Sequence, residues 1–310
     1  MTTIDLNGRV AIVTGAGGGL GRAHALLLAK RGARVLVNDL GGSRDGNGGG
    51  SAMADAVVEE IRTAGGEAMS NGASVTDAAQ VADMVAQVVD RWGRVDILVN
   101  NAGILRDRTF AKLDLEDFRT VVDVHLMGSI NCTKAVWDLM RAQGHGRILM
   151  TTSSSGLYGN FGQSNYGAAK MGLVGAMKTL AQEGAKYGVR VNALAPSAAT
   201  RMTADIMSED QLTALDPSTV APAMLALVCD DAPTGMIMCA GAGSFECAHI
   251  TMTQGLYVGT GDDAAEQVLA GLDRIADRAG EIVPATGLEQ STYELARAAQ
   301  GRQPAVSVHG

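Results

Sequence analysis

The sequence predicts an α/β protein with a single doubly wound parallel sheet of seven strands, helices on both faces and a helical C-terminal extension. The first observation is that short β-branched runs alternate with amphipathic stretches from the start of the chain to about residue 240. Strands and helices in alternation are typical of a parallel sheet covered on both sides. The second is the composition: 46% of the residues are hydrophobic and 19% are charged, which excludes intrinsic disorder.

Seven apolar runs of strand length supply the expected sheet. They are residues 10–13, 34–38, 67–72, 97–100, 147–151, 189–195 and 236–239. Longer stretches between them have apolar residues at helical spacing. The expected helices include residues 23–30, 52–62, 78–91, 115–140 and 168–187. We expect residues 1–260 to form one domain, in which residues 197–260 act as a substrate lid, and residues 261–310 to form the helical extension.

Charge and targeting signals narrow the function classes. The formal net charge of −8 argues against nucleic acid as a partner, since phosphate binding needs clustered Lys and Arg. No apolar run reaches about 18 residues, so we expect no membrane span. The chain starts without a signal-peptide pattern, which makes the cytoplasm the expected location. The four cysteines contain no C-x-x-C pair, and no metal site is expected.

A glycine-rich turn follows the first expected strand. The chain there reads Thr-Gly-Ala-Gly-Gly-Gly-Leu-Gly, residues 14–21, and a helix follows. Gly15 permits a tight turn, while Gly19, Leu20 and Gly21 bring backbone amides and a helix N-terminus close to a pyrophosphate. A turn of this kind between a first strand and a first helix is typical of a Rossmann-type dinucleotide site.

Residues after the next strands would contact the rest of a nicotinamide dinucleotide. Asp39 ends the second strand, where a carboxylate can accept both ribose hydroxyls of NAD and repel the additional phosphate of NADP. NAD is therefore the expected cofactor, although Arg22 nearby keeps NADP open. The other expected cofactor neighbours follow the third and fourth strands, and they are Ser74, Val75, Asn101, Ala102 and Gly103.

The candidate catalytic residues follow the fifth strand. Ser153 lies in a Thr-Thr-Ser-Ser-Ser run, Tyr166 comes 13 residues later, and Lys170 comes four residues after Tyr166. Tyr and Lys at i and i+4 share one helix face, which places the ammonium beside the phenol. We expect Lys170 and an oxidised nicotinamide to lower the phenol pKa from its usual value of about 10. Ser153 would hold the substrate oxygen while Tyr166 moves the proton and the nicotinamide takes the hydride.

Taken together, these motifs are similar to those of the short-chain dehydrogenase/reductase family over residues 9 to about 245. The stretches VNDLGG, NNAGILRDRTFAKL, VHLMGS and SGLYGNFGQSNYGAAK resemble the members that act on (3R)-hydroxyacyl-CoA esters and, in some cases, on steroid alcohols. The resemblance implies catalytic roles for Ser153, Tyr166 and Lys170 and a ribose-binding role for Asp39.

Two positions depart from the family pattern. His125 stands where most members have a catalytic Asn, and it is kept as a catalytic candidate. A main-chain carbonyl there could still hold the water that links to Lys170, and a neutral core histidine is an equal alternative. The usual Pro-Gly after the sixth strand is Pro196-Ser197, which weakens the cofactor contacts expected of Pro196 and Thr200.

The expected substrate is a lipid-like small molecule, either a CoA ester or a steroid. The methionine-rich segment 197–260 suits a bulky apolar group. Arg106 and Arg108 would bind the coenzyme A head, or they would instead be ion-paired with neighbouring acids. The sequence thus predicts NAD-dependent oxidation of a (3R)-hydroxyacyl-CoA or a 17β-hydroxysteroid, including a steroid side-chain acyl-CoA.

Alternatives to this function stay open. One is a 3-oxoacyl reductase or a small secondary-alcohol dehydrogenase of the same family. Another is a non-enzymatic nucleotide sensor, against which the intact Ser153, Tyr166 and Lys170 argue. Small residues between positions 168 and 176, on the helix that carries Tyr166, would let another helix approach closely. With the family resemblance, they predict a homodimer or homotetramer.

Overall fold

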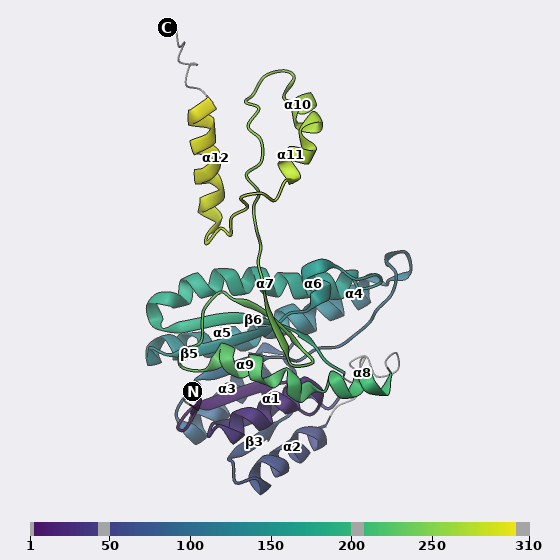
Figure 1. The fold of residues 1–310 in the computed structure, drawn as a ribbon. Coiled ribbons are helices and arrows are strands. Elements are labelled where there is room, and N and C mark those ends of the chain that lie inside the picture. Colours follow the sequence, from purple (N-terminus) through teal and green to yellow (C-terminus); the bar gives the residue numbers. More distant parts are fainter. Residues whose placement is uncertain (1–2, 43–49, 200–207, 302–310) are drawn as a thin grey trace, which may run out of the picture. The chain divides into compact units, whose positions relative to one another are not determined.

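The computed structural model describes residues 3–42, 50–199 and 208–301 of the chain (Figure 1). It divides into two compact units, Met1–Cys247 and Ala248–Gly310. The strands are β1 (Val10–Thr14), β2 (Arg34–Asn38), β3 (Ala68–Asn71), β4 (Ile97–Asn100), β5 (Gly146–Thr151), β6 (Val189–Ser197), β7 (Ile237–Gly241) and β8 (Ser244–Ala248). The α-helices of the first unit are α1 (Gly19–Lys30), α2 (Ala52–Thr63), α3 (Ala78–Trp92), α4 (Leu115–Val122), α5 (Gly128–Gln143), α6 (Ser154–Tyr158), α7 (Ser164–Gly184), α8 (Glu209–Ala214) and α9 (Ala221–Val228).

A single sheet has the strand order β3-β2-β1-β4-β5-β6-β7-β8. Neighbouring strands from β3 to β7 pair in parallel, which confirms the doubly wound α/β fold that the alternating pattern predicts. The chain begins in the middle with β1, proceeds outward to β3 and then crosses over to β4. The direction of winding therefore reverses between β1 and β4. In folds of this kind the ligand crevice lies beyond the carboxyl ends of the strands at that point.

The strand β8 is one more than the seven that the sequence predicts. Ala242 and Gly243 connect β7 to β8, and their φ angles are both positive, at 50° and 78°. Two such residues in a two-residue connection form a tight hairpin turn, so β8 runs antiparallel to β7. The left-handed conformation costs a residue with a Cβ about 1–2 kcal/mol. Because alanine occupies the first position, the sequence lacks the Asn-Gly or Asp-Gly signal that usually reveals such a turn.

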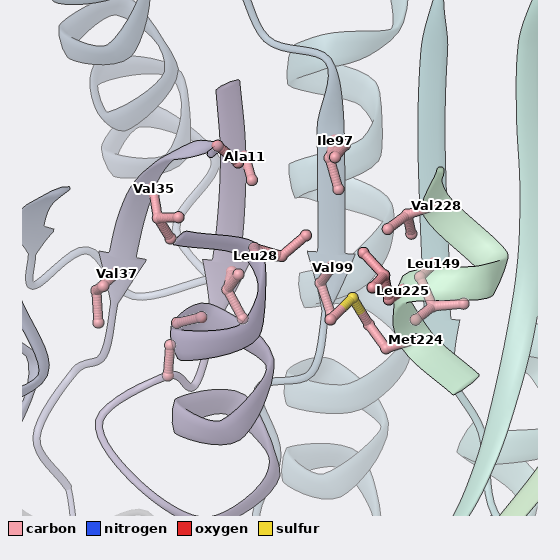
Figure 2. Packing of buried hydrophobic residues seen from close by; sticks show 14 of the residues in the cluster. Ala11, Leu28, Val35, Val37, Ile97, Val99, Leu149, Met224, Leu225 and Val228 are labelled. Atoms are coloured by element: carbon pink, nitrogen blue, oxygen red, sulfur yellow. The ribbon is translucent and has the colours of Figure 1, made fainter. Parts of the chain in front are cut away.

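Helices cover both faces of the sheet. The helices α1, α2 and α9 pack on one face, and α3, α5 and α7 pack on the other (Figure 1). Figure 2 shows part of the first layer, in which Leu28 of α1 and Met224 and Leu225 of α9 belong to the same buried cluster as Val99 and Leu149 of the sheet. Full burial of each large aliphatic side chain contributes about 1.5–3 kcal/mol. This layer is therefore a main source of the stability of the fold.

The helix expected over residues 115–140 is interrupted by a π-helical segment. It consists of α4, the π segment Asp123–Met127 and α5 in unbroken succession. At the end of the π segment the Gly128 N–H donates to the Asp123 carbonyl, five residues back instead of four. Such segments are rare and are frequently found at functional sites. This one carries His125.

The second unit contains α10 (Ala264–Ala270), α11 (Leu272–Ala276) and α12 (Gly287–Gly301). An antiparallel bridge joins Met252 to Ile282. The Tyr293 hydroxyl and the Arg297 guanidinium both donate to the Gln254 carbonyl, at 2.8 and 2.9 Å. These bonds attach α12 to the segment with which the unit begins.

The domain boundary near residue 260 and the lid role of residues 197–260 stay predictions. Residues 200–207 of that segment lie outside the described residues. In the described part of the chain, no helix is both long enough and apolar enough to cross a membrane.

His24 is a buried histidine of α1 whose ring nitrogens both lack a hydrogen-bond partner among the described residues. Burial lowers its pKa to about 4. In an unfolded chain the pKa of histidine is about 6.5. Between these two pH values the unfolded state binds a proton that the folded state does not bind. Acidification through this window therefore destabilises the fold.

We predict that His24→Leu removes this part of the acid sensitivity. The free energy of unfolding of the wild-type protein should fall by about 2 kcal/mol between pH 7 and pH 5 through His24, because one pKa unit corresponds to about 1.4 kcal/mol. The His24→Leu variant should lose about that much less, as measured by urea unfolding at both pH values. His249→Gln, at an exposed histidine, is the control. An identical pH dependence for His24→Leu and the wild-type protein would contradict the prediction.

Candidate active site

A cavity of about 790 Å³ lies at the carboxyl edge of the sheet. This size is typical of small-molecule and cofactor sites. Most of the expected site residues line it, namely Gly15, Gly19, Leu20, Asp39, Ser74, Val75, Asn101, Ala102, Gly103, Arg106, His125, Ser153, Tyr166, Lys170 and Pro196. Gly21 and Arg108 are not among the lining residues. Thr200 lies outside the described residues.

Close packing makes glycine necessary in the turn between β1 and α1. Gly15 has a φ of 60°, and a Cβ built there would lie 2.7 Å from the Ala102 Cα. A Cβ on Gly21 would clash with the Gly15 carbonyl and would lie 2.6 Å from Asn101 Nδ2. Gly21 therefore contributes by permitting the turn and not by lining the cavity. The turn between β1 and α1 therefore packs so closely against the loop after β4 that no side chain fits between their backbones.

Thr14 and Asn101 join these two segments by hydrogen bonds. The Thr14 hydroxyl oxygen accepts the N–H groups of Asn101 and Ala102, at 3.0 and 3.1 Å. The Asn101 amide donates in return to the carbonyls of Thr14 and Gly15, at 3.0 and 2.9 Å. Asn101 thus holds the glycine turn in shape. Thr14 was not among the expected site residues, and its position as the last residue of a buried strand was the only available signal.

Asp39 stands at the edge of the glycine turn. One carboxylate oxygen accepts the Gly17 N–H and the other accepts the Gly41 N–H, both at 2.8 Å. Arg22 is ion-paired with Glu60, with Nε and Oε1 3.0 Å apart. Asp39 thus lines this end of the cavity, and the guanidinium of Arg22 is already paired with a carboxylate.

Asn38 supports the loop that contains Ser74 and Val75, although the sequence analysis did not single it out. Its buried amide donates to Asn71 Oδ1 at 3.2 Å and to the Ala73 carbonyl at 2.9 Å. The loop is held from its other side by Asn131, which donates to the Val75 carbonyl at 2.9 Å. A polar residue at the end of an otherwise apolar strand was the signal for Asn38.

Ser153, Tyr166 and Lys170 come together where β5 ends and α7 begins. The Tyr166 hydroxyl is hydrogen-bonded to the Ser153 side chain. Lys170 is 3% exposed, and its ammonium donates to the Thr151 carbonyl at 2.6 Å and lies 5.5 Å from the centre of the Tyr166 ring. The Thr152 hydroxyl donates to the Lys170 carbonyl at 2.7 Å and ties α7 to β5. The three side chains therefore form a rigid group on the cavity wall.

Burial governs the electrostatics of this group. Burial raises the pKa of Tyr166, the hydrogen bond to Ser153 lowers it, and the Asp107 carboxylate raises it again. Burial lowers the pKa of Lys170 to about 7. A lowered phenol pKa was expected from Lys170 together with an oxidised nicotinamide, and it stays a prediction.

His125 lies beside this group. Its ring meets the Tyr166 ring edge to face, with centres 5.1 Å apart and planes at 88°. His125 Nε2 is 2.7 Å from the Ile104 carbonyl oxygen, and Nδ1 is buried with no partner in the part of the chain that the structure describes. The main-chain carbonyl of His125 accepts a hydrogen bond from the Ser129 hydroxyl at 2.7 Å. The carbonyl expected to bind a relay water is thus already engaged within its own helix.

The two arginines expected at the substrate end are placed differently from each other. Arg106 lines the cavity and is ion-paired with Asp117 at 2.7 Å. Arg108 is exposed, and its guanidinium donates to the Asp107 carbonyl. Between them, Asp107 lines the cavity and accepts a hydrogen bond from Gln163 at 2.7 Å. Asp107 is one of the neighbouring acids that the sequence analysis considered only as ion-pair partners of the arginines.

Comparison with known proteins identifies the family. A model described as short chain dehydrogenase matches residues 9–211. The chain belongs to this family. It is therefore an oxidoreductase, and the resemblance seen in the motifs is confirmed. Mouse peroxisomal multifunctional enzyme type 2 is 53% identical over 222 residues, which cover 72% of this chain and 30% of the mouse protein. The chain thus matches less than a third of that relative's length.

Two solved structures extend the comparison. A short chain dehydrogenase from Mycobacterium avium is 40% identical with a TM-score of 0.77, over 88% of this chain and 97% of that one. A 7α-hydroxysteroid dehydrogenase complexed with NADH and 7-oxo glycochenodeoxycholic acid is 27% identical with a TM-score of 0.70, over 78% of this chain and 98% of that one. Both confirm the fold. The second holds a nicotinamide cofactor in a related short-chain dehydrogenase.

We predict that Gly21→Ala weakens nucleotide binding. The new Cβ would push the Gly15 carbonyl and the Asn101 amide apart, and overpacking of this kind costs about 1–3 kcal/mol. The dissociation constant for NADH, followed by fluorescence titration, should rise by about 10-fold or more. Gly175→Ala on α7, where a Cβ would meet open space, is the matched control and should leave binding unchanged. Equal affinities for all three proteins would refute the structural role of Gly21.

Proposed function

We propose that this short-chain dehydrogenase uses NAD to oxidise a secondary alcohol on a lipid-like substrate. The substrate is either a (3R)-hydroxyacyl-CoA or a 17β-hydroxysteroid, and a steroid side-chain acyl-CoA is included. The observation that carries the proposal is the Tyr166 phenol on the cavity wall, hydrogen-bonded to Ser153 and beside the Lys170 ammonium. This arrangement provides a proton acceptor, an oxygen-binding hydroxyl and a positive charge at one point.

The residues present fit a nicotinamide dinucleotide. The glycine turn and the N-terminus of α1 offer backbone amides to a pyrophosphate, and Asp39 offers a carboxylate to a ribose. When bound, the nicotinamide supplies the hydride acceptor. Side chains of the protein carry out the proton transfer. Ser153 holds the substrate oxygen, Tyr166 takes the hydroxyl proton, and Lys170 stabilises the phenolate that Tyr166 must form first.

The preference for NAD over NADP rests on charge. The Asp39 carboxylate lies where an adenosine ribose would bind, and a 2′-phosphate there would be repelled. The guanidinium of Arg22, which could bind such a phosphate, is already paired with Glu60. Both observations support NAD.

The substrate class rests on similarity and on the cavity. The relative that matches this chain at 53% identity is a peroxisomal multifunctional enzyme, and the hydroxysteroid dehydrogenase supports a steroid alcohol. Arg106 lines the cavity and is ion-paired with Asp117, and we assign its guanidinium to an anionic head group. The oligomeric state and the cytoplasmic location stay predictions.

The reverse direction is the second candidate function. A 3-oxoacyl reductase or a small-alcohol dehydrogenase of this family would use Tyr166 as an acid. The raised pKa of Tyr166 favours this alternative, because the phenol is protonated in the protein alone. A protonated phenol is ready to donate to a carbonyl oxygen and must be deprotonated before it can oxidise an alcohol.

A substrate panel tests the proposal. NADH absorbance should rise with (3R)-hydroxyacyl-CoA esters or with 17β-hydroxysteroids, and not with short secondary alcohols. Tyr166→Phe should reduce kcat by about 10²–10⁴-fold, the usual contribution of a general base, and should leave nucleotide affinity nearly unchanged. Activity on short alcohols alone would support the alternative. Absence of turnover across the whole panel, with no change in Tyr166→Phe, would favour a nucleotide sensor.

We predict that Asp39→Ser relaxes the cofactor preference. The loss of a charged acceptor costs about 1.5–3 kcal/mol, so the ratio of kcat/KM for NAD to that for NADP should fall by about 10–100-fold. Asp39→Asn keeps a side-chain oxygen for the glycine turn and removes the charge, which separates electrostatics from structure. If both variants retain the wild-type ratio, Asp39 does not select the cofactor.

A further inference from the structure

Asp107 lies in a loop that is hydrogen-bonded to the start of α7 at three successive residues. Its carboxylate accepts the side-chain amide of Gln163, the N-cap residue of α7, at 2.7 Å. The Arg106 carbonyl before it accepts the Asn165 amide at 3.0 Å, and the main-chain N–H after it donates to the Gly162 carbonyl at 3.0 Å. The carboxylate therefore has a fixed place against the first turn of α7.

This place is beside the phenol that is to move the proton. Tyr166 follows Gln163 by three residues, and residues three apart at the start of a helix lie on the same face. Asp107 and Tyr166 both line the cavity. Burial raises the pKa of Tyr166, and the Asp107 carboxylate is close enough to raise it further. The carboxylate therefore acts on the phenol without touching it.

The adjacent arginines do not form an ion pair with the Asp107 carboxylate. Arg106 directs its guanidinium to Asp117, at 2.7 Å. The Arg108 guanidinium donates to the main-chain carbonyl of Asp107 and not to its side chain. Among the described residues, the carboxylate has the neutral amide of Gln163 as its partner, and Oδ1 is buried with none. A charge that is partly removed from water is weakly screened, so its effect reaches the phenol.

We infer that Asp107 is a positioning residue for the Tyr166 proton: its fixed negative charge holds the phenol in the protonated form and so sets the pH at which Tyr166 becomes a base. The inference rests on the proposed function, because oxidation of an alcohol requires that base. A phenol beside a carboxylate retains its proton, and the same phenol without that charge releases it at lower pH. Asp107 therefore determines the pH range in which the dehydrogenase oxidises.

The other groups that face Tyr166 do not cancel this charge at neutral and alkaline pH. Lys170 of α7 carries a positive charge, but burial lowers its pKa to about 7, so that charge declines above neutrality. His125 of the π segment meets the phenol ring and stays neutral, because burial and the Lys170 charge hold its pKa well below the usual range. Ser153, after β5, supplies a hydrogen bond and no charge. Asp107, from the loop after β4, then decides the balance.

The test compares Asp107→Asn with the wild-type protein in the full chain. Asn keeps an oxygen that can accept the Gln163 amide, and it removes the charge. The Ser155 hydroxyl donates to the oxygen of that amide at 2.7 Å, so the amide nitrogen stays the donor in the variant. Asp107→Glu keeps the charge and is the conservative variant. Asp123→Asn, at another carboxylate that lines the cavity, is the matched control.

The first readout is the titration of the phenol itself. In NMR spectra of protein labelled with ¹³C at the ζ carbon of tyrosine, the Tyr166 midpoint should fall by about one pH unit in Asp107→Asn, a tenfold loss of proton affinity. It should stay near the wild-type value in Asp107→Glu and in Asp123→Asn. Tyr166→Phe assigns the signal.

Kinetics supply the second readout. In Asp107→Asn, the acid limb of kcat/KM for oxidation should move to lower pH by about one unit, because the phenolate forms more readily. A residue that only supports the loop would lower the rate at every pH and leave the limb in place. An unchanged Tyr166 midpoint in Asp107→Asn, or an equal shift in Asp123→Asn, would overturn the inference.

The two readouts separate the inference from the proposed function. The NMR titration needs no substrate, so a shifted Tyr166 midpoint in a protein that oxidises no member of the substrate panel supports the role of Asp107 and contradicts the proposed oxidation. Oxidation of the panel with an unshifted midpoint contradicts the role of Asp107 and leaves the proposed function intact.

Discussion

The joint between the ends of β1 and β4 is the interaction on which the site depends. Thr14 and Asn101 exchange hydrogen bonds through side chain and backbone, and they fix the glycine turn against the loop that leads to Gly103. Parallel strands place all their carboxyl ends at one edge of the sheet, but they do not fix the loops that follow. The joint of Thr14 and Asn101 fixes these loops where the direction of winding reverses, between β1 and β4. Because Gly103 packs on the His125 ring, the same joint reaches the catalytic group.

Burial is the second constraint on the site. It disfavours the charged forms of Tyr166 and Lys170, but it also strengthens the attraction between those forms once they exist. Desolvation raises the pKa of Tyr166 and lowers that of Lys170 to about 7, so both groups are biased toward their neutral forms. A buried ion pair of phenolate and ammonium is costly to form, but its attraction is strong in a medium of low polarity. Each acceptor around the ammonium therefore matters. The Thr151 carbonyl is one such acceptor, at 2.6 Å.

Residues whose role follows from type and spacing were accessible from the sequence. Gly15, Asp39 and the trio Ser153, Tyr166 and Lys170 fall at fixed offsets from strand ends, and parallel pairing brings those offsets together. Properties that arise only from packing were not accessible. Whether burial or attraction decides the pKa of Tyr166 depends on surroundings that no local pattern records.

Departures from regular geometry likewise could not be predicted from the sequence. The π turn around His125 adds no residue type that a helical pattern would reject, and the hairpin before β8 uses alanine where glycine or asparagine would reveal it. Thr14 and Asn38 are small polar residues at strand ends, which are common in any α/β protein. Their importance comes from the particular backbone groups that they meet.

At the amino edge of the sheet, buried charged side chains are paired with other groups of the protein. Asp96 is fully buried, and it accepts hydrogen bonds from Arg94 and from the Val10 N–H at 2.6–2.9 Å. Arg147 donates to the carbonyls of Cys229 and Asp230 and so attaches the chain after α9 to β5. Every bond in this network closes on a protein group, and removing one partner would strand a buried charge. At the carboxyl edge, by contrast, His125 Nδ1 and one oxygen of Asp107 are buried without partners in the protein. Buried atoms without partners also occur away from the cavity, at His24 and at Arg141 Nε. What distinguishes the carboxyl end of β5 is that His125 and Asp107 line the cavity, where a ligand could supply the missing partners.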